Sequence, residues 1–357
     1  MQLNTMSESD LPRYDRARSY EWNYDHAPDP VDIEIPAVPG DWTFCGKRVR
    51  SPLGIPAGPL LGGRWVLYYA SLGFDVLTYK TVRSGSRECY PLPNLAPVRC
   101  GQLTGEEVEL PAEPQMSGSW AVSFGMPSKS PDVWRADVEH TREKLPPGKL
   151  LSVSVVGTIQ PGWSLDQLAD DYAQCARWAA ESGADVVETN FSCPNVATRD
   201  GQLYQEPRAA GLVAARVRDA IGRVPLIIKI GHLTDRAAAE ELLDAVADHV
   251  TAIAMTNSVA AAVRGPDGAL LFDGQRRGIC GDAIRQASHE QVKMLSTVAA
   301  ARAPHVRLIG VGGASTAEHV RAYLSAGAEA VHLATSAMVD PGVGLAIRRA
   351  MSDHAQS

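Results

Sequence analysis

No stretch of about 20 apolar residues occurs in this 357-residue sequence, so no segment has the composition of a membrane-spanning helix. The N-terminal residues MQLNTMSESDLPRYDRARSYEW also lack the basic start and the apolar stretch of a secretory signal. Lysine and arginine are scattered and the net charge is −7, which argues against a basic surface for nucleic acid. We therefore expect a cytoplasmic protein that binds neither a membrane nor nucleic acid.

The six cysteines form no CxxC pair and no cluster with histidine at metal-ligand spacing. The pattern therefore predicts neither a metal site nor an iron–sulfur cluster. A buried cysteine usually behaves as a small hydrophobic residue, so we expect reduced thiols that are mostly structural.

From about residue 51 onward, short apolar segments alternate with longer amphipathic ones such as residues 165–182 and 235–248. The apolar segments are continuous rather than alternating, as in parallel strands that are buried on both faces. Eight candidate strands begin near Leu53, Asp75, Leu150, Asp185, Pro225, Val250, Val306 and Ala330. This repeat predicts an α/β protein of the (β/α)8 TIM barrel class. An open, doubly wound sheet is the alternative, but no GxGxxG follows the first strand.

Two segments interrupt the repeat. Residues 1–50 are rich in Tyr, Trp, Pro and Asp, and we interpret them as an irregular N-terminal extension ending in a strand over residues 42–49 that closes the barrel floor. Residues 84–130 are rich in Gly and Pro and too long for a simple connection, which indicates a long insertion after strand 2 at the active site. We expect the barrel itself to span residues 51–357.

Polar side chains interrupt the apolar strands at their C-terminal ends, where barrel enzymes carry their chemistry. The segment TNFSCPN, residues 189–195, brings two amides and a thiol to the end of the fourth strand. Asn190 and Asn195 could bind a planar ring with carbonyl and N–H groups, and Cys193 could exchange a proton with a carbon acid. A tight Cys-Pro-Asn turn with capping amides is the structural alternative.

The ends of the last two strands, residues 310–316 with three glycines and residues 333–338 with small side chains, are the second signal. Loops after strands 7 and 8 of a barrel commonly hold a phosphate through backbone N–H groups, so a phosphorylated ligand is indicated. Plain turn glycines are the alternative.

Two lysines at strand ends, Lys80 and Lys229, are flanked by apolar residues that should direct them into the barrel mouth. A buried lysine without an anion is costly, and a flavin ring would be a suitable partner. A Schiff base with a carbonyl substrate and a lysine that reaches to solvent are the rival interpretations.

Taken together, these segments resemble the dihydroorotate dehydrogenase family, in the same order from Ser51 to about Gly342. The matching segments are SPLGIPAG, TYKT, SFGMPS, NFSCPN, IIKIG, TNS, RGICG, GVGG and ATS. The resemblance implies an FMN-dependent oxidoreductase of the soluble kind, in which a cysteine is the catalytic base.

The resemblance also implies roles for individual residues. Cys193 would be catalytic. The substrate would be bound by Lys80, Asn190, Asn195, Asn257, Ser258 and the backbone N–H groups of Phe124, Gly125 and Met126. FMN would be bound by Ala57, Gly58, Lys80, Thr81, Asn190, Lys229, Gly278, Gly281, Gly312, Gly313, Ala334 and Thr335. A homodimer is expected by the same resemblance, and the electron acceptor stays open.

The implied reaction is oxidation of dihydroorotate to orotate, with proton removal from C5 by Cys193 and hydride transfer from C6 to flavin N5. One departure bears on the substrate: Val122 stands where related enzymes place an asparagine before the carboxylate loop. A dihydropyrimidine dehydrogenase-like or repurposed flavoenzyme acting on another pyrimidine or enone ring is therefore the main alternative. A tRNA dihydrouridine synthase is disfavoured, since no basic domain follows the barrel. A non-catalytic flavin- or phosphate-binding barrel is the alternative from another class.

Overall fold

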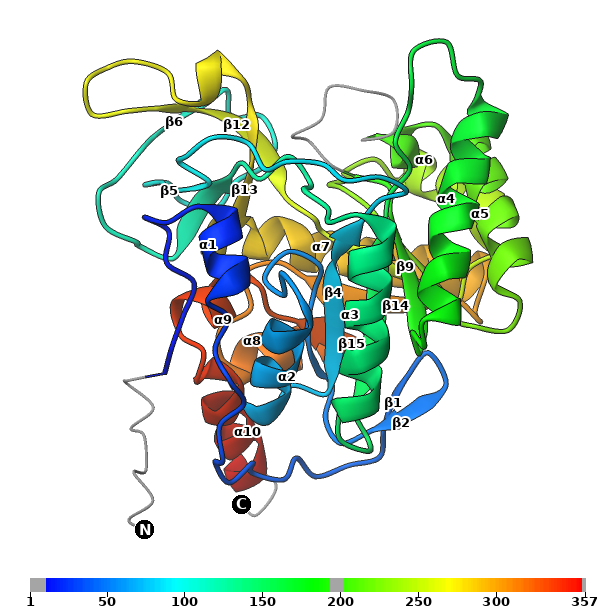
Figure 1. Cartoon of the computed structure of the whole chain (residues 1–357), viewed down its shortest axis with the longest axis horizontal. Helices are drawn as coiled ribbons and strands as arrows, with labels where there is room; N and C mark the ends of the chain where they lie inside the picture. The colour runs from blue at the N-terminus through cyan, green and yellow to red at the C-terminus, as the bar shows by residue number, and fades with distance from the viewer. Residues whose placement is uncertain (1–10, 193–201, 355–357) are drawn as a thin grey trace.

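A computed structural model describes residues 11–192 and 202–354, and its centre is a closed barrel of eight parallel strands (Figure 1). Neighbouring strands follow one another in the chain, and the last pairs with the first. The barrel strands are β3 (Leu53–Ile55), β4 (Val76–Val82), β8 (Leu150–Val155), β9 (Val186–Asn190), β10 (Leu226–Lys229), β11 (Ala252–Met255), β14 (Arg307–Val311) and β15 (Ala330–His332). The predicted (β/α)8 barrel is confirmed, and closure excludes the open sheet.

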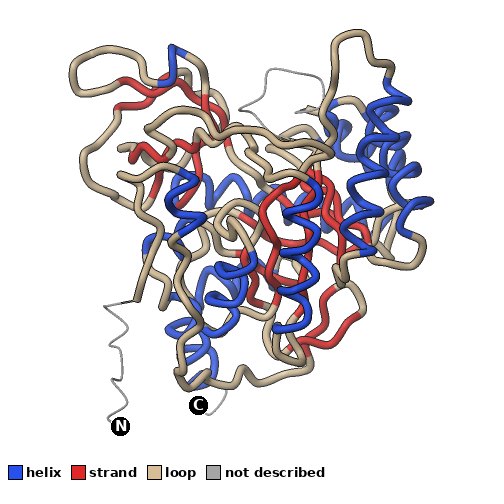
Figure 2. Tube along the Cα trace, viewed as in Figure 1, coloured by secondary structure: helices blue, strands red, loops and turns tan. Residues whose placement is uncertain are grey.

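Each barrel strand is followed by a helix that covers the outside of the sheet (Figure 2). These helices are α2 (Gly63–Ser71), α3 (Pro131–Lys144), α4 (Leu165–Glu181), α5 (Pro207–Ile221), α6 (Arg236–Val246), α7 (Arg285–Arg302), α8 (Ala317–Ser325) and α10 (Val343–His354). Capping explains two predicted starts: Ser164 forms a capping box with Gln167, and Asp235 accepts from the first N–H groups of α6. None of the described helices combines the length and the apolar character that a membrane span requires.

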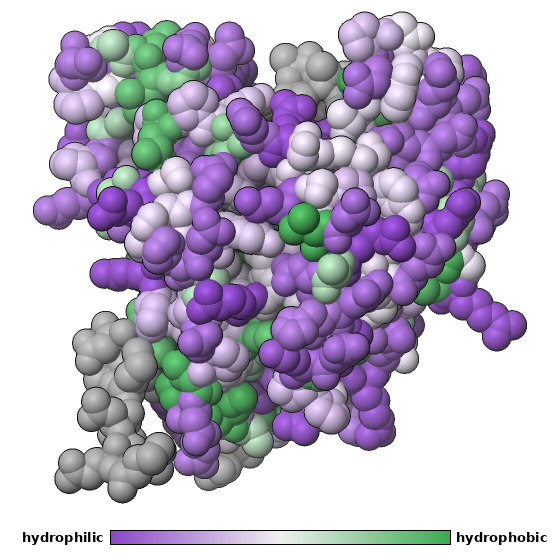
Figure 3. All heavy atoms as spheres, in the orientation of Figure 1, coloured by the Kyte–Doolittle hydropathy of each residue, from purple (hydrophilic) through white to green (hydrophobic). Residues whose placement is uncertain are grey.

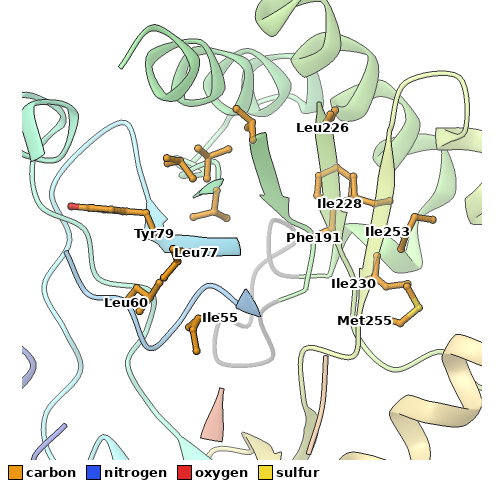
Figure 4. Close-up of a cluster of buried hydrophobic side chains, with 14 of the residues drawn as sticks. Ile55, Leu60, Leu77, Tyr79, Phe191, Leu226, Ile228, Ile230, Ile253 and Met255 are labelled. Carbon is orange, nitrogen blue, oxygen red and sulfur yellow. The ribbon is translucent and has the colours of Figure 1, made fainter. Parts of the chain in front are cut away.

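Side chains alternate between the two faces of the barrel wall. Outward-facing residues such as Ile228 and Ile253 belong to the large core under the helices (Figure 4). Inward-facing residues such as Val186 and Ile227 form a separate apolar cluster with Phe44 at the barrel floor. The barrel is therefore filled with side chains and is not a pore.

The N-terminal extension differs in one detail from the prediction. Residues 42–49 form two strands, β1 (Trp42–Phe44) and β2 (Lys47–Val49), rather than one. Cys45 and Gly46 both have positive φ, which makes the tight turn of a hairpin. The hairpin still brings Phe44 into the barrel floor, as expected of a closing segment. A short helix, α1 (Tyr20–Asp25), precedes it.

A second sheet of five strands stands beside the barrel mouth (Figure 1). The insertion after β4 supplies β5 (Leu95–Pro97), β6 (Glu109–Pro111) and β7 (Ser119–Val122). It pairs with a second insertion after β11, made of β12 (Val259–Arg264) and β13 (Arg277–Gly281), which the sequence did not reveal. Apolar surface lies over β6 and β12 (Figure 3), near the exposed Val108 and Leu270.

A buried ion network ties the C-terminal helix to the barrel. Arg348 of α10 and Lys149 before β8 both contact the carboxylate of Asp75, at 3.0 Å each. Ser51 donates a hydrogen bond to the same carboxylate, and Arg348 also donates to the carbonyl of Gly73. Because all four side chains are buried, removing one charge would leave the others uncompensated in a medium of low polarity.

Polar groups occupy the middle of the barrel, above the apolar floor. Thr78, Ser152, Glu188 and His332 are each nearly fully buried, and each has a side-chain atom without a hydrogen-bond partner among the described residues. The ring of His332 stacks on Phe44, with centroids 5.5 Å apart, and neither ring nitrogen has a hydrogen-bond partner in the described part of the chain. Burial, with Lys229 nearby, lowers the pKa of His332 to about 3.

This pKa predicts an acid-sensitive contribution to stability. As the pH falls from about 6.5 towards 3, the unfolded chain protonates His332 while the folded chain does not, so the free energy of unfolding decreases. The loss should approach about 1.4 kcal/mol per pH unit within that window. His332→Gln should remove this slope, as measured by urea unfolding between pH 7 and pH 5.

The control is His140→Gln, because His140 is exposed on α3. It should leave the pH dependence of unfolding unchanged. An equal slope in the wild type and in His332→Gln would show that His332 does not titrate as its burial requires.

Candidate active site

One cavity of about 530 Å³ lies at the C-terminal ends of the barrel strands, between the barrel and the second sheet. Residues far apart in the chain meet around it because parallel strands end at the same rim. The predicted site residues that line it are Ala57, Gly58, Lys80, Thr81, Phe124, Met126, Asn190, Lys229, Asn257, Ser258, Gly278, Gly281, Gly312, Gly313, Ala334 and Thr335. Gly125 does not line the cavity, and Cys193 and Asn195 lie outside the described residues.

The loop after β7 has an unusual backbone. Gly125 and Met126 both have positive φ, 75° and 53°, and the second value is uncommon for a residue other than glycine. A Cβ atom on Gly125 would lie 2.7 Å from the ring of Tyr90, so a larger residue does not fit there. The buried guanidinium of Arg83 donates to the carbonyl of Met126, which helps to hold the loop in this conformation.

The N-terminal extension also packs against this loop. Tyr14 and Tyr20 meet the ring of Phe124 edge-on, with centroids 5.9 and 6.0 Å apart. Arg16 donates to the carbonyl of Pro114 in the insertion. The extension therefore helps to position Phe124, which lines the cavity.

The side-chain amides of Asn190 and Asn257 both bind the backbone of Ser192. The Asn190 side-chain oxygen accepts from the N–H of Ser192 at 3.1 Å, and its amide nitrogen lies 3.6 Å from Sδ of Met126. The Asn257 amide donates to the carbonyl of Ser192. Both side chains are thereby fixed at the cavity wall, where their remaining donor and acceptor capacity can face a ligand.

Two lysines bring positive charge to the cavity. Lys80 at the end of β4 and Lys229 at the end of β10 are both buried. Lys229 donates to the carbonyl of Ala57 at 3.4 Å, and it forms no salt bridge within residues 11–192 and 202–354. A buried ammonium group favours an anionic or electron-rich ligand.

At one end of the cavity, a loop with two glycines packs closely against α7. Gly312 and Gly313 have φ values of 142° and 68°, which L side chains rarely adopt. A Cβ on Gly313 would lie 2.6 Å from Cβ of Arg285, and a Cβ on Gly312 would lie 2.8 Å from Cβ of Ser288. Glycine is therefore needed at both positions for the loop to pack against α7, and both residues also line the cavity.

The sequence missed several lining residues. Cys280 and Trp120 come from β13 and β7 of the second sheet and line the cavity. The thiol of Cys280 donates to the carbonyl of Asn257 at 3.7 Å. In the segment RGICG, residues 277–281, only the two glycines were predicted to belong to the site. The cysteine that stands between them was the signal that could have identified Cys280.

Val122 also lines the cavity, so the residue that stands where related enzymes place an asparagine does face the site. The nearest amide along the paired strand, that of Asn94, is buried and donates to the carbonyl of Ser123 at 3.0 Å. This amide is therefore used to hold the loop, and the cavity wall at Val122 is apolar.

Comparisons with known proteins agree with this geometry. The family model described as dihydroorotate dehydrogenase matches residues 41–353. A dihydroorotate dehydrogenase of Dictyostelium discoideum is 31% identical, over 94% of this chain and 96% of the relative. The catalytic subunit of dihydroorotate dehydrogenase B (NAD(+)) of Maridesulfovibrio salexigens is 25% identical, over 85% and 89%.

A solved structure has the same fold. It is the crystal structure of DHODH from Eimeria tenella in complex with ferulenol, with a TM-score of 0.71 and 16% identity, covering 94% of this chain and 89% of that chain. At this identity the likeness concerns the fold, whereas the family model and the Dictyostelium relative span the cavity-lining residues in sequence. The chain therefore belongs to the dihydroorotate dehydrogenase family.

Proposed function

We propose that this protein is an FMN-dependent dehydrogenase that oxidises dihydroorotate to orotate. The proposal rests on one observation: two buried lysines, two fixed amides and the glycine loop at Gly312 and Gly313 line one cavity, in a chain of this family. The class of reaction is oxidation of a CH–CH bond in pyrimidine metabolism. A carrier without turnover would not need this combination at one rim.

The cavity residues fit FMN. The close-packed loop at Gly312 and Gly313, with Gly281, Ala334 and Thr335, would hold the phosphate, and Lys229 would face the electron-rich edge of the ring. Ala57, Gly58, Thr81 and Gly278 would complete the ring contacts. When bound, FMN supplies the acceptor for the hydride that leaves the substrate.

The substrate would lie between this ring and the loop after β7. The backbone N–H groups of Phe124, Gly125 and Met126 would bind its carboxylate, and the left-handed conformation of the last two is consistent with an anion-binding turn. Asn190, Asn257 and Ser258, together with Lys80 and Asn195, would pair with the polar atoms of the pyrimidine ring.

Cys193 would remove the proton from C5 of the substrate. It follows Ser192, whose backbone binds both Asn190 and Asn257, so its place in the chain is next to two proposed ring ligands. In the reverse direction the thiol would act as the acid. The protein thus contributes orientation and a proton acceptor.

Val122 supports a second candidate function. An apolar wall where an amide would otherwise meet the ring would leave a polar substrate atom unpaired, at a cost of about 1–3 kcal/mol. A different or substituted pyrimidine or an enone ring would avoid this cost, as in a dihydropyrimidine dehydrogenase-like enzyme.

The cytoplasmic location, the homodimer and the barrel boundary at residue 51 stay predictions.

Dihydroorotate should reduce the bound flavin. We expect purified protein to be yellow and its band near ~450 nm to bleach when dihydroorotate is added without oxygen, because hydride reaches the cofactor. Dihydrouracil, which lacks the carboxylate, should bleach it far more slowly. Bleaching by dihydrouracil alone would favour the second candidate, and colourless protein that takes up no FMN would disprove the flavoenzyme.

Cys193→Ala should lower the rate of this bleaching by about 10²–10⁴-fold, the usual contribution of a positioned base. Flavin content should not change, since the phosphate cradle is formed by other loops. Cys100→Ala is the matched control, because Cys100 does not line the cavity. If Cys193→Ala retained the wild-type rate, another group would have to be the base.

A further inference from the structure

Glu188 is an acidic side chain in the barrel interior, below the cavity. It lies on β9, two residues before Asn190, and the alternation of the strand turns both side chains inward. Glu188 is 1% exposed. Its Oε1 atom has no hydrogen-bond partner among the residues that the structure describes. The proposed function does not use this group.

A hydrogen-bond chain connects Glu188 to the cavity wall. Ser154, opposite Glu188 in the β8–β9 pairing, donates a hydrogen bond to the carboxylate. The Thr81 and Ser154 hydroxyl oxygens lie 3.1 Å apart. Because a hydroxyl has one proton and Ser154 donates it to Glu188, Thr81 must be the donor to Ser154. The chain therefore begins at a cavity-lining residue and ends on the carboxylate.

Lys229 is the charged neighbour of this carboxylate. In the β9–β10 pairing, Ile227 lies opposite Glu188 and Lys229 lies opposite Asn190, so the two charged residues are diagonal neighbours on the inner face. Burial raises the pKa of Glu188 above its ordinary value, and Lys229 and the hydrogen bond from Ser154 oppose this rise, so these two contacts are what favours the ionised form. Two further titratable groups face the barrel interior: Lys80 of β4 is a second buried lysine at the same rim, and burial lowers the pKa of His332 on β15.

We propose that Glu188 is a positioning residue whose ionised carboxylate, held by Ser154, offsets the charge of Lys229 and so sets the reduction potential of the bound flavin. This inference rests on the proposed function, because it requires FMN over Lys229. The reduced ring carries more negative charge than the oxidised one, so Lys229 favours reduction and the carboxylate below it opposes reduction. In an interior of low polarity, one buried charge near the flavin appreciably changes the equilibrium between its oxidised and reduced forms.

The test is the midpoint potential of the flavin in the purified, FMN-loaded protein. Glu188→Gln keeps the shape and removes the charge, so the potential should rise. We expect the oxidised–reduced equilibrium to move at least about tenfold, which is about 30 mV for a two-electron couple. Glu188→Asp, which restores the charge, should return the potential most of the way to the wild-type value.

Ser152→Ala is the matched control, because Ser152 is a buried, uncharged residue two positions before Ser154 on β8, and its hydroxyl has no hydrogen-bond partner among the described residues. It should leave the potential unchanged. An unaltered potential in Glu188→Gln, or an equal rise in Ser152→Ala, would overturn the inference, since a merely structural role predicts no effect of charge.

If Glu188→Gln failed to retain FMN, Ser154→Ala would decide. Loss of the Ser154 donor makes the ionised carboxylate less favourable, so the potential should rise by a smaller amount, and no rise would contradict the inference. The two levels of failure are distinguishable. Wild-type protein that takes up no FMN would overturn the proposed function and this inference with it, whereas a yellow protein whose potential ignores Glu188 overturns the inference alone.

Discussion

The alternation of side chains along eight parallel strands is the constraint on which the rest of this molecule depends. Once the barrel closes, every second residue of each strand must fit into one narrow interior. At the floor that interior is apolar and is closed by Phe44. Higher up, any polar side chain that points inward is withdrawn from water, so it must find a partner or lie beneath a ligand. Glu188 and His332 are in this position, directly below the residues that form the cavity.

The barrel could be predicted from the sequence because burial on both faces leaves a strong signal. The eight expected strand starts lie within about two residues of those observed, since continuous apolar runs of this length have few other interpretations. Strands β12 and β13 were missed for the opposite reason. The residues of β12 alternate between buried and less buried, and β13 begins and ends beside glycines. Both strands also acquire partners from an insertion more than a hundred residues earlier in the chain.

The site divides in the same way. Lys80, Asn190 and Lys229 could be predicted because a polar residue at the end of an apolar strand is conspicuous and a closed barrel brings such ends together. Trp120 could not, because its place at the cavity depends on the pairing of β7 with β13, and Cys280 was marked only by the glycines on either side of it. Glu188 stands in the same segment as Asn190, but the sequence alone gives no indication that its Oε1 atom has no hydrogen-bond partner within residues 11–192 and 202–354.

The proposed contacts to the cofactor and to the substrate differ in the parts of the chain that supply them. The proposed FMN contacts come largely from the barrel and from glycines packed against α7, whose geometry follows from the fold common to the family. The proposed substrate contacts come partly from the barrel rim and partly from the loop after β7, which is held by Arg83 and by Tyr14 and Tyr20. The extension and the insertion can therefore change the ring that is accepted without disturbing the barrel. For this reason Val122 bears on the choice of substrate, whereas the flavin chemistry depends on the charges inside the barrel.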